Sequence, residues 1–117
     1  MKELTKAEEQ IMQAVWRIEK GFLKEIIEEL PNPKPAYNTV LTVCRILVQK
    51  EFLKFNTYGK AHQYYPTISK EKYSSQTLGS VKKKYFNNSS KQLLSFFIKD
   101  NDLSIEDLND ILNDLKK

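Results

Sequence analysis

The hydrophobic residues of the chain change their spacing once before residue 66, and this change constrains the fold more than any other feature. Up to residue 50, apolar side chains recur every three or four positions, which is typical of amphipathic helices. This spacing then gives way to two short aromatic-rich runs, 52–56 and 61–65, which are typical of β-strands. The residues between them, Thr57-Tyr58-Gly59-Lys60, supply a glycine that suits a tight turn. We therefore expect helices first and a single β-hairpin after them.

Three helices are predicted before the hairpin. The first covers about residues 6–19, and Thr5 and Glu8 can form a capping box at its start. The second is short and ends at Pro31, and the third covers about residues 37–50. Helix, helix, helix, hairpin is the order of a winged helix-turn-helix, so the predicted fold is mainly α with a small β-hairpin wing. The expected core combines alternating aromatics of the hairpin with Trp16, Ile26, Ile27, Val40 and Leu47.

Beyond Pro66 the sequence shows only helical patterns. Ser69 is a good N-cap for a helix to about Phe86, Ser89-Ser90-Lys91-Gln92 resembles a capping box, and residues 104–107 can open a last helix. These helices total roughly fifty residues, too few to bury their leucine, isoleucine and phenylalanine side chains by themselves. We therefore predict a winged helix-turn-helix domain over 1–66 and a three-helix dimerisation region over 67–117. The expected partner is a second copy, giving a homodimer.

Composition excludes most enzymes. The only cysteine, Cys44, and the only histidine, His62, cannot build a disulfide, a cysteine-rich zinc site or a site that needs two imidazoles. Three glycines leave no room for a phosphate-cradling loop. We therefore expect no cofactor, no metal and no catalytic residues. No stretch approaches the roughly 18 consecutive apolar residues of a membrane span, so we expect no membrane insertion and a cytoplasmic location.

Charge is distributed unevenly along the sequence. Residues 1–33 carry five Lys/Arg against seven Glu, residues 34–99 carry twelve Lys/Arg against two Glu, and residues 100–117 carry two Lys against six acids. A basic middle flanked by acidic ends is typical of a surface that binds a polyanion. The alternative is a basic surface that is merely solvated.

The predicted helix 37–50 has two distinct faces. Val40, Val43, Cys44 and Leu47 form an apolar stripe, whereas Asn38, Thr42, Arg45 and Gln49 form a hydrogen-bonding stripe. The second stripe suits a recognition helix in the major groove of DNA, with Asn38, Thr42 and Arg45 reaching base edges or phosphates. Tyr37 and Thr39 would then bind the DNA backbone. The alternative is a solvated face.

The hairpin carries polar and aromatic side chains that could contact DNA phosphates or the minor groove. The alternative is an ordinary surface hairpin. His62 is expected to be a polar surface or phosphate-contacting residue, and Cys44 a small core residue. The candidate wing residues are Lys54, Tyr58, Lys60, His62 and Gln63.

Several separate motifs, in the same order, resemble the penicillinase-repressor (BlaI/MecI/CopY-type) family. The resemblance is close from Leu4 to Tyr73 and weaker up to the C-terminus. It is carried by Leu4-Thr5-Lys6-Ala7-Glu8, Met12, Val15-Trp16, Tyr37-Asn38-Thr39-Val40-Leu41-Thr42, the run from Arg45 to Leu53, Tyr58-Gly59-Lys60-Ala61, Tyr64-Tyr65-Pro66 and Ser69-Lys70-Glu71-Lys72-Tyr73.

The resemblance implies a bacterial, dimeric winged-helix repressor that binds a palindromic operator and dimerises through its C-terminal helices. The family's operator contacts fall on Tyr37, Asn38, Thr39, Thr42 and Arg45, and its wing contacts fall on Lys60 and its neighbours. The chain has Glu51 where the family usually has glycine, and Ile46 where a second arginine often follows Arg45.

The resemblance also implies a route of induction. In antibiotic-responsive members a sensor-triggered protease cuts between asparagine and phenylalanine in the short apolar helix, and the corresponding bond here is Ser95-Phe96, without the asparagine. The cysteine-rich metal motif of the copper-responsive branch is not found at the end of this sequence.

Together these features predict a homodimeric transcriptional repressor that binds double-stranded operator DNA. A membrane sensor or protease acting upstream is a possible further partner under the same resemblance. The alternative is a protein-interaction adaptor that uses a winged-helix fold without sequence-specific DNA binding, and Ile46 and Glu51 are the residues that favour it.

Overall fold

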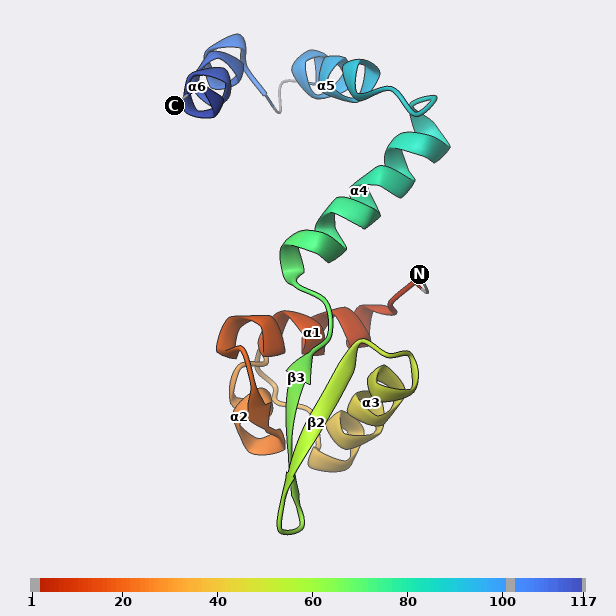
Figure 1. The fold of residues 1–117 in the computed structure, drawn as a ribbon, viewed down its shortest axis with the longest axis vertical. Helices are drawn as coiled ribbons and strands as arrows, with labels where there is room; N and C mark the ends of the chain where they lie inside the picture. The colour runs from red at the N-terminus through yellow and green to blue at the C-terminus, as the bar shows by residue number, and fades with distance from the viewer. Residues whose placement is uncertain (1–2, 101–102, 117) are drawn as a thin grey trace. The chain divides into compact units, whose positions relative to one another are not determined.

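The computed structural model describes residues 3–100 and 103–116. The chain divides into two compact units, residues 1–73 and 74–117. In the first unit, α1, α2 and α3 pack around the base of a small sheet, and the turn of the hairpin extends away from α1 (Figure 1). This is the mainly helical fold with a small β-wing that the sequence predicts.

Helix α1 (Lys6–Ile18) begins with the expected capping box. The backbone amide of Glu8 donates to Thr5 Oγ1 at 3.2 Å, and the amide of Thr5 donates to Glu8 Oε1 at 2.8 Å. The chain then bends at Glu19, which has a φ of 70°, and at Gly21 a Cβ atom would lie 2.5 Å from Ile18 Cδ1. A glycine at this position therefore lets the next segment pack closely against the end of α1.

Strand β1 (Gly21–Phe22) and helix α2 (Leu23–Glu28) follow directly. The Glu25 carboxylate accepts a hydrogen bond from the amide of Phe22 at 2.9 Å, which satisfies one free donor at the start of the helix. At the other end, Lys34 Nζ donates to the carbonyl oxygens of Glu28 and Leu30. The lysine thus caps the last turn, where a positive charge is favourable.

Helix α3 (Tyr37–Gln49) ends in a Schellman motif. The amide of Phe52 donates to the carbonyl oxygen of Leu47 at 2.9 Å, and the amide of Glu51 donates to that of Val48 at 3.0 Å. Glu51 has a φ of 68°, in the left-handed region that favours glycine. Glu51, which stands where the family usually has glycine, therefore occupies a position whose backbone conformation favours glycine.

Strands β2 (Leu53–Tyr58) and β3 (Ala61–Pro66) form the hairpin, and β1 adds to β3, so the antiparallel order is β1-β3-β2. The first strand is longer than the expected run 52–56, because Thr57 pairs with His62 and Tyr58 pairs with Ala61. Gly59, with a φ of 61°, and Lys60 form a two-residue turn that matches the twist of the strands. The two residues of β1 were not expected.

The core of the first unit lies between the three helices and the sheet. Ile26, Val40 and Leu47 are buried as expected, but Trp16 and Ile27 are only partly buried at its margin. The aromatics of the hairpin also do not all point inward: Tyr64 is buried, whereas 39% of Phe55 is exposed. The remaining buried apolar residues include Ile11, Met12, Val15, Leu23, Cys44, Phe52 and Leu53.

The first unit extends into the start of helix α4 (Lys70–Tyr85). Trp16 Nε1 donates to the carbonyl oxygen of Ile68 at 2.9 Å. The ring of Tyr73 lies 5.6 Å from that of Trp16 and 5.8 Å from that of Phe52, measured between centroids. Ile68 and Tyr73 therefore pack on the core although they follow residue 66. The predicted boundary at residue 66 stays a prediction.

The second unit contains the rest of α4, α5 (Ser90–Lys99) and α6 (Ile105–Leu115). Ser104 and Asp107 form a capping box at the start of α6. At α5, Ser89 Oγ accepts from the amide of Gln92 at 3.1 Å, but the Gln92 side chain accepts from Asn87 Nδ2. The capping box expected there is thus formed only by its serine half.

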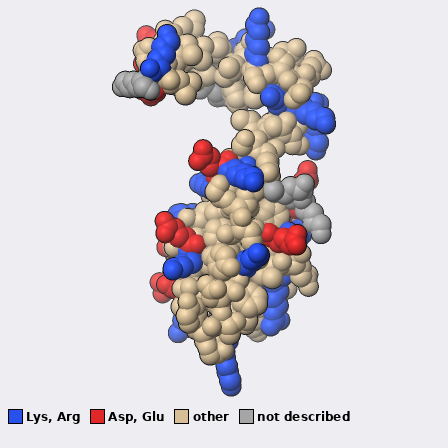
Figure 2. All heavy atoms as spheres, in the orientation of Figure 1, with Lys and Arg blue, Asp and Glu red and all other residues tan. Residues whose placement is uncertain are grey.

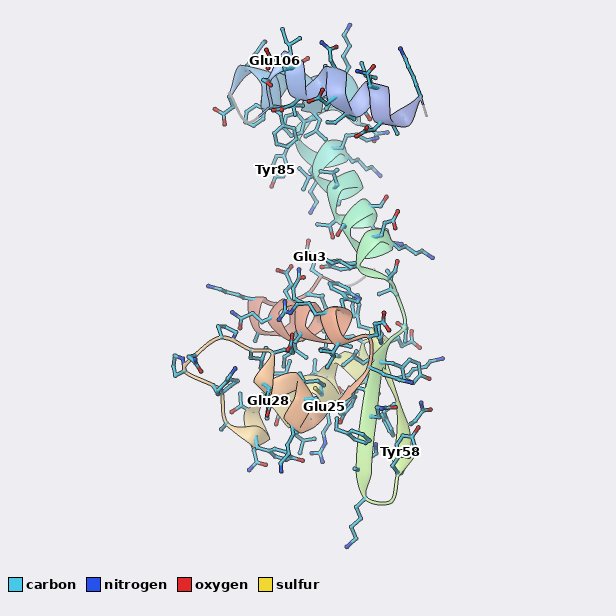
Figure 3. All side chains as sticks on the ribbon, turned by 90° about the vertical axis from the view of Figure 1, so that its left-hand side faces the viewer. Glu3, Glu25, Glu28, Tyr58, Tyr85 and Glu106 are labelled. Atoms are coloured by element: carbon cyan, nitrogen blue, oxygen red, sulfur yellow. The ribbon has the colours of Figure 1, made fainter. Side chains whose placement is uncertain are left out.

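Few side chains of the second unit are buried. Of its described residues, only Leu93 is a buried hydrophobic residue. Tyr85, labelled on α4 in Figure 3, is 75% exposed. The unit therefore presents much apolar surface within a single chain. Across residues 3–100 and 103–116, no helix is both long and apolar enough to cross a membrane.

Candidate nucleic-acid interface

Helix α3 presents the polar face that its sequence predicts. Val40, Cys44 and Leu47 are buried, which fixes the rotation of the helix against the core. Tyr37, in the first turn of α3, lies on the same side as Cys44 but is 54% exposed. Asn38, Thr42 and Arg45 are exposed because they lie on the opposite side of the 3.6-residue repeat. All five candidate contact residues on α3 are thus exposed. They are Tyr37, Asn38, Thr39, Thr42 and Arg45.

The Thr42 side chain is already engaged within the helix. Its hydroxyl donates to the carbonyl oxygen of Asn38 at 2.9 Å. Thr42 therefore presents its methyl group and the lone pairs of its oxygen to solvent, which suits contact with a thymine methyl or with a donor on a base edge.

A buried ion pair holds the end of α3 against α1. Lys50 Nζ lies 2.8 Å from Glu8 Oε1 and 3.0 Å from Glu8 Oε2. Burial alone raises the pKa of the Glu8 carboxyl, but hydrogen bonds from Lys50 and from the amide of Thr5 outweigh it, so the pKa lies below its ordinary value of 4.5. The charged form of Glu8 is thus the one that pairs with Lys50 at the end of α3.

The register of the hairpin divides the candidate wing residues between two faces. Successive residues of a strand point to opposite faces, and directly paired residues share a face. Lys54 pairs with Tyr65, and Tyr58 with Ala61, on one face, whereas His62 pairs with Thr57 on the other. Tyr58 lies on the hairpin beside the turn (Figure 3), where its ring centroid is 5.7 Å from that of Phe22.

His62 and Gln63 are less accessible than the other candidate wing residues, Lys54, Tyr58 and Lys60, which are exposed. His62 is half-buried, and its ring lies edge-on to Phe55 with a centroid distance of 4.1 Å. Its Nδ1 atom is buried without a hydrogen-bond partner among the described residues. The proton of the neutral ring is therefore better placed on Nε2, which leaves that nitrogen as the donor.

A groove of about 400 Å³ lies between the start of α2, helix α3 and the hairpin, and we call it the helix–wing groove. It brings together four of the predicted residues, Tyr37, Arg45, Lys60 and His62. Asn38, Thr39, Thr42, Lys54 and Tyr58 do not line it. The other lining residues are Phe22, Leu23, Lys24, Leu41, Ala61 and Tyr64.

Phe22 and Lys24 are two of the groove residues that sequence analysis did not assign to the site. Lys24 follows the two-residue strand β1 and lies in the acidic first third of the sequence, where it was counted with its acidic neighbours. The pairing of Phe22 with Gln63 of β3 brings this segment beside the hairpin. In the sequence, the only local indication of this strand is the pair Gly21-Phe22 directly before α2.

The charge around the groove is positive. Lys24, Arg45 and Lys60 line it, and no carboxylate does so among the described residues. On the face shown in Figure 2, acidic side chains lie away from the tip of the hairpin, which carries basic atoms. Burial raises the pKa of Tyr64, which lines the groove, above its ordinary value of 10.

No feature of catalysis accompanies this surface. The part of the chain that the structure describes has no cluster of histidine, cysteine and acidic residues able to hold a metal. Burial raises the pKa of the Cys44 thiol to about 12. Cys44 is fully buried, which confirms it as a small core residue.

An exposed polar helix face beside a basic β-wing defines a winged helix-turn-helix DNA-binding protein. The sequence profile of the penicillinase repressor family matches residues 4–117. The chain therefore belongs to the penicillinase repressor family, as the motifs indicated, and is a DNA-binding regulator rather than an enzyme.

Individual relatives agree with this assignment. The chain is 28% identical to a penicillinase repressor of Staphylococcus aureus, over 98% of this chain and 94% of the relative. It is also 28% identical to the methicillin resistance regulatory protein MecI of Staphylococcus aureus strain N315, over 95% of this chain and 94% of the relative. A solved structure, the DNA-binding domain of the repressor BlaI, aligns with a TM-score of 0.53 and 26% identity, covering 62% of this chain and 94% of that one.

Proposed function

We propose that the protein is a homodimeric transcriptional repressor that binds a pseudo-palindromic operator in the cytoplasm and blocks access of polymerase. The observation that carries this proposal is the exposed polar face of α3 next to a groove lined by three cations. Each subunit would place α3 in a major groove, with half-sites about 34–36 Å apart or slightly more. Direct base contacts are assigned to Asn38, Thr42 and Arg45, and backbone contacts to Tyr37 and Thr39.

The wing supplies backbone contacts in this proposal. Lys60 lies in the hairpin turn and lines the helix–wing groove, so it can reach a phosphate beside the recognition helix. His62 would donate from Nε2 on the same side. Lys54 and Tyr58, on the opposite sheet face, would contact the flanking backbone, and Lys24 joins the set because it borders the groove.

The second unit would form the dimer. Its described helices expose large apolar side chains that a single chain leaves in contact with water, and such surface marks an interaction site. A second copy would cover them, in line with the prediction from sequence. The exposed residues are Leu78, Tyr85, Leu94, Phe96, Ile105, Ile111, Leu112 and Leu115.

Release of repression is assigned to cleavage of Ser95-Phe96 by a sensor-activated protease. Phe96 is 50% exposed, so its side chain is accessible to another protein. The bond lies inside α5, so this helix must unwind locally before a protease can bind it in extended form. Co-expression with the candidate sensor should give fragments 1–95 and 96–117 by mass spectrometry. An intact chain in induced cells would exclude this route.

Fluorescence anisotropy tests the main proposal. Purified protein is titrated into DNA from its own promoter region and into a scrambled control at two salt concentrations, and the mass of the complex is measured. Tight promoter binding by two copies, stronger than control at both salts, is expected. Weak, equal binding to both DNAs that salt abolishes would refute the proposal and favour an interaction adaptor that recruits a partner through its C-terminal helices.

A further inference from the structure

The helix–wing groove has two chemically different parts. Its rim carries Lys24, Arg45 and Lys60. Its floor is apolar and buried, because Leu23 is only 6% and Tyr64 only 4% exposed, with half-buried Leu41 beside them. A cationic rim above an apolar floor is the typical composition of a small-molecule site, and about 400 Å³ lies within the usual range of roughly 300–1,000 Å³.

DNA binding uses the rim of this groove but leaves the floor unexplained. Phosphates and base edges are polar, so they gain from Arg45 and Lys60. The apolar groups that DNA does offer, the thymine methyl and the sugar, are small against a groove of about 400 Å³. The floor is therefore a feature of the site that the proposed function does not account for.

We propose that the helix–wing groove binds a small planar aromatic carboxylate. The flat ring would lie on the apolar floor, while the carboxylate would accept hydrogen bonds from the planar guanidinium of Arg45, with Lys24 and Lys60 adding charge. The absence of any carboxylate among the described lining residues favours an anion over a cation or a neutral ligand.

The ligand would regulate DNA binding, and this part rests on the proposed function. The carboxylate and a DNA phosphate both need Arg45 and Lys60, so one occupant excludes the other. Thermodynamic linkage then requires that the ligand weakens DNA binding by the same factor by which DNA weakens ligand binding. The operator would be released by a metabolite without any cleavage of the chain.

The first experiment measures ligand binding to the full chain without DNA. The probe is 1-naphthoate, followed by its fluorescence anisotropy, with neutral 1-naphthalenemethanol and sodium sulfate as separate controls. One 1-naphthoate per chain is expected, with weaker binding of the alcohol and no displacement by sulfate at equal ionic strength. Equal binding of acid and alcohol, or no saturable binding of the acid, would overturn the proposal.

Two matched variants locate the site. Lys24→Gln removes an exposed cation of the rim, and Lys6→Gln makes the same change on α1, which does not line the groove. Lys24→Gln should weaken 1-naphthoate binding about two- to fivefold, as expected for one solvated charge contact, while Lys6→Gln leaves it unchanged. Equal effects of the two variants would place the ligand elsewhere and overturn the proposal.

The second experiment adds promoter DNA and separates the two proposals. 1-Naphthoate at concentration L should raise the apparent Kd for promoter DNA by the factor 1 + L/KL, where KL is its own Kd for the free protein, and sulfate at equal ionic strength should not. If the protein binds 1-naphthoate but no DNA, the repressor function fails and the ligand site stands. If it binds DNA but occupancy by 1-naphthoate leaves DNA affinity unchanged, the regulatory inference is wrong and the repressor function stands.

Discussion

Replacing Glu51 by glycine should stabilise the DNA-binding unit. Glu51 is the residue after α3, its φ is 68°, and its amide completes the Schellman motif by donating to Val48. A residue with a Cβ atom loses about 1–2 kcal/mol in this left-handed conformation. Glycine removes that loss but has about 0.5–1 kcal/mol more backbone entropy to lose on folding. The expected net gain in the free energy of unfolding is about 0.5–1 kcal/mol.

Urea unfolding followed by Trp16 fluorescence measures this gain, because the only tryptophan lies in the same unit. The matching rise in Tm is about 2–8 °C for a domain of this size. Glu51→Ala is the control: it removes the carboxylate but keeps the Cβ atom, so it should stay within about 0.5 kcal/mol of the parent. Equal stabilisation by alanine and glycine would show that the charge, rather than the backbone conformation, limits stability, and would refute this account.

Four further changes probe other parts of the molecule. Lys60→Ala should weaken binding to promoter and scrambled DNA alike and reduce the slope of log K against log salt by about 0.9. Arg45→Ala should lose mainly specificity for the promoter in the same anisotropy assay. Equal losses of affinity for both DNAs in both variants would contradict this division of roles. A chain ending at residue 76, which keeps Tyr73, should stay folded and should be monomeric by analytical ultracentrifugation. It should bind the promoter much more weakly, because one subunit no longer holds the other at the second half-site. Binding at full strength would argue against dimerisation by the second unit. The lowered pKa of Glu8 means that its ion pair with Lys50 adds stability above about pH 4.5, the unfolded value, and that this stability is lost as the pH falls through the lower folded pKa. Urea unfolding of Glu8→Gln should therefore show a smaller loss of stability on acidification than the parent, and identical pH profiles would exclude this role.

Sequence reasoning succeeded where a structure is determined by nearby residues. The start of α1 follows from Thr5 and Glu8, which hydrogen-bond each other across one turn. The exposed face of α3 follows from a repeat of apolar residues within thirteen positions. Both depend on local chemistry, so they can be inferred before any tertiary contact is known.

Sequence reasoning failed for features that depend on contacts between residues far apart in the chain. Strand β1 has only two residues, and it is a strand only because Gly21 and Phe22 pair with Tyr64 and Gln63 of β3. The same pairing brings Lys24 to the helix–wing groove, so the groove could not be assembled from the sequence alone. The partial burial of His62 depends likewise on its contact with Phe55 across the hairpin.

The packing of residues after the hairpin was also missed. Pro66 ends the last strand and was the natural place to expect the end of the domain. Ile68 and Tyr73 nevertheless pack on the core. The indole of Trp16 donates a hydrogen bond to the carbonyl oxygen of Ile68, and the ring of Tyr73 contacts the rings of Trp16 and Phe52. None of these contacts follows from the spacing of residues.

The buried thiol of Cys44 can be used to detect local opening of the winged domain. The thiol is the only one in the chain, it is inaccessible, and its pKa of about 12 keeps it protonated at neutral pH. Because alkylating reagents need an accessible thiolate, labelling can proceed only when the core opens. The rate of labelling would therefore measure the opening equilibrium of the winged domain under native conditions. Operator DNA that binds the closed state should slow that rate, without any dye or tag.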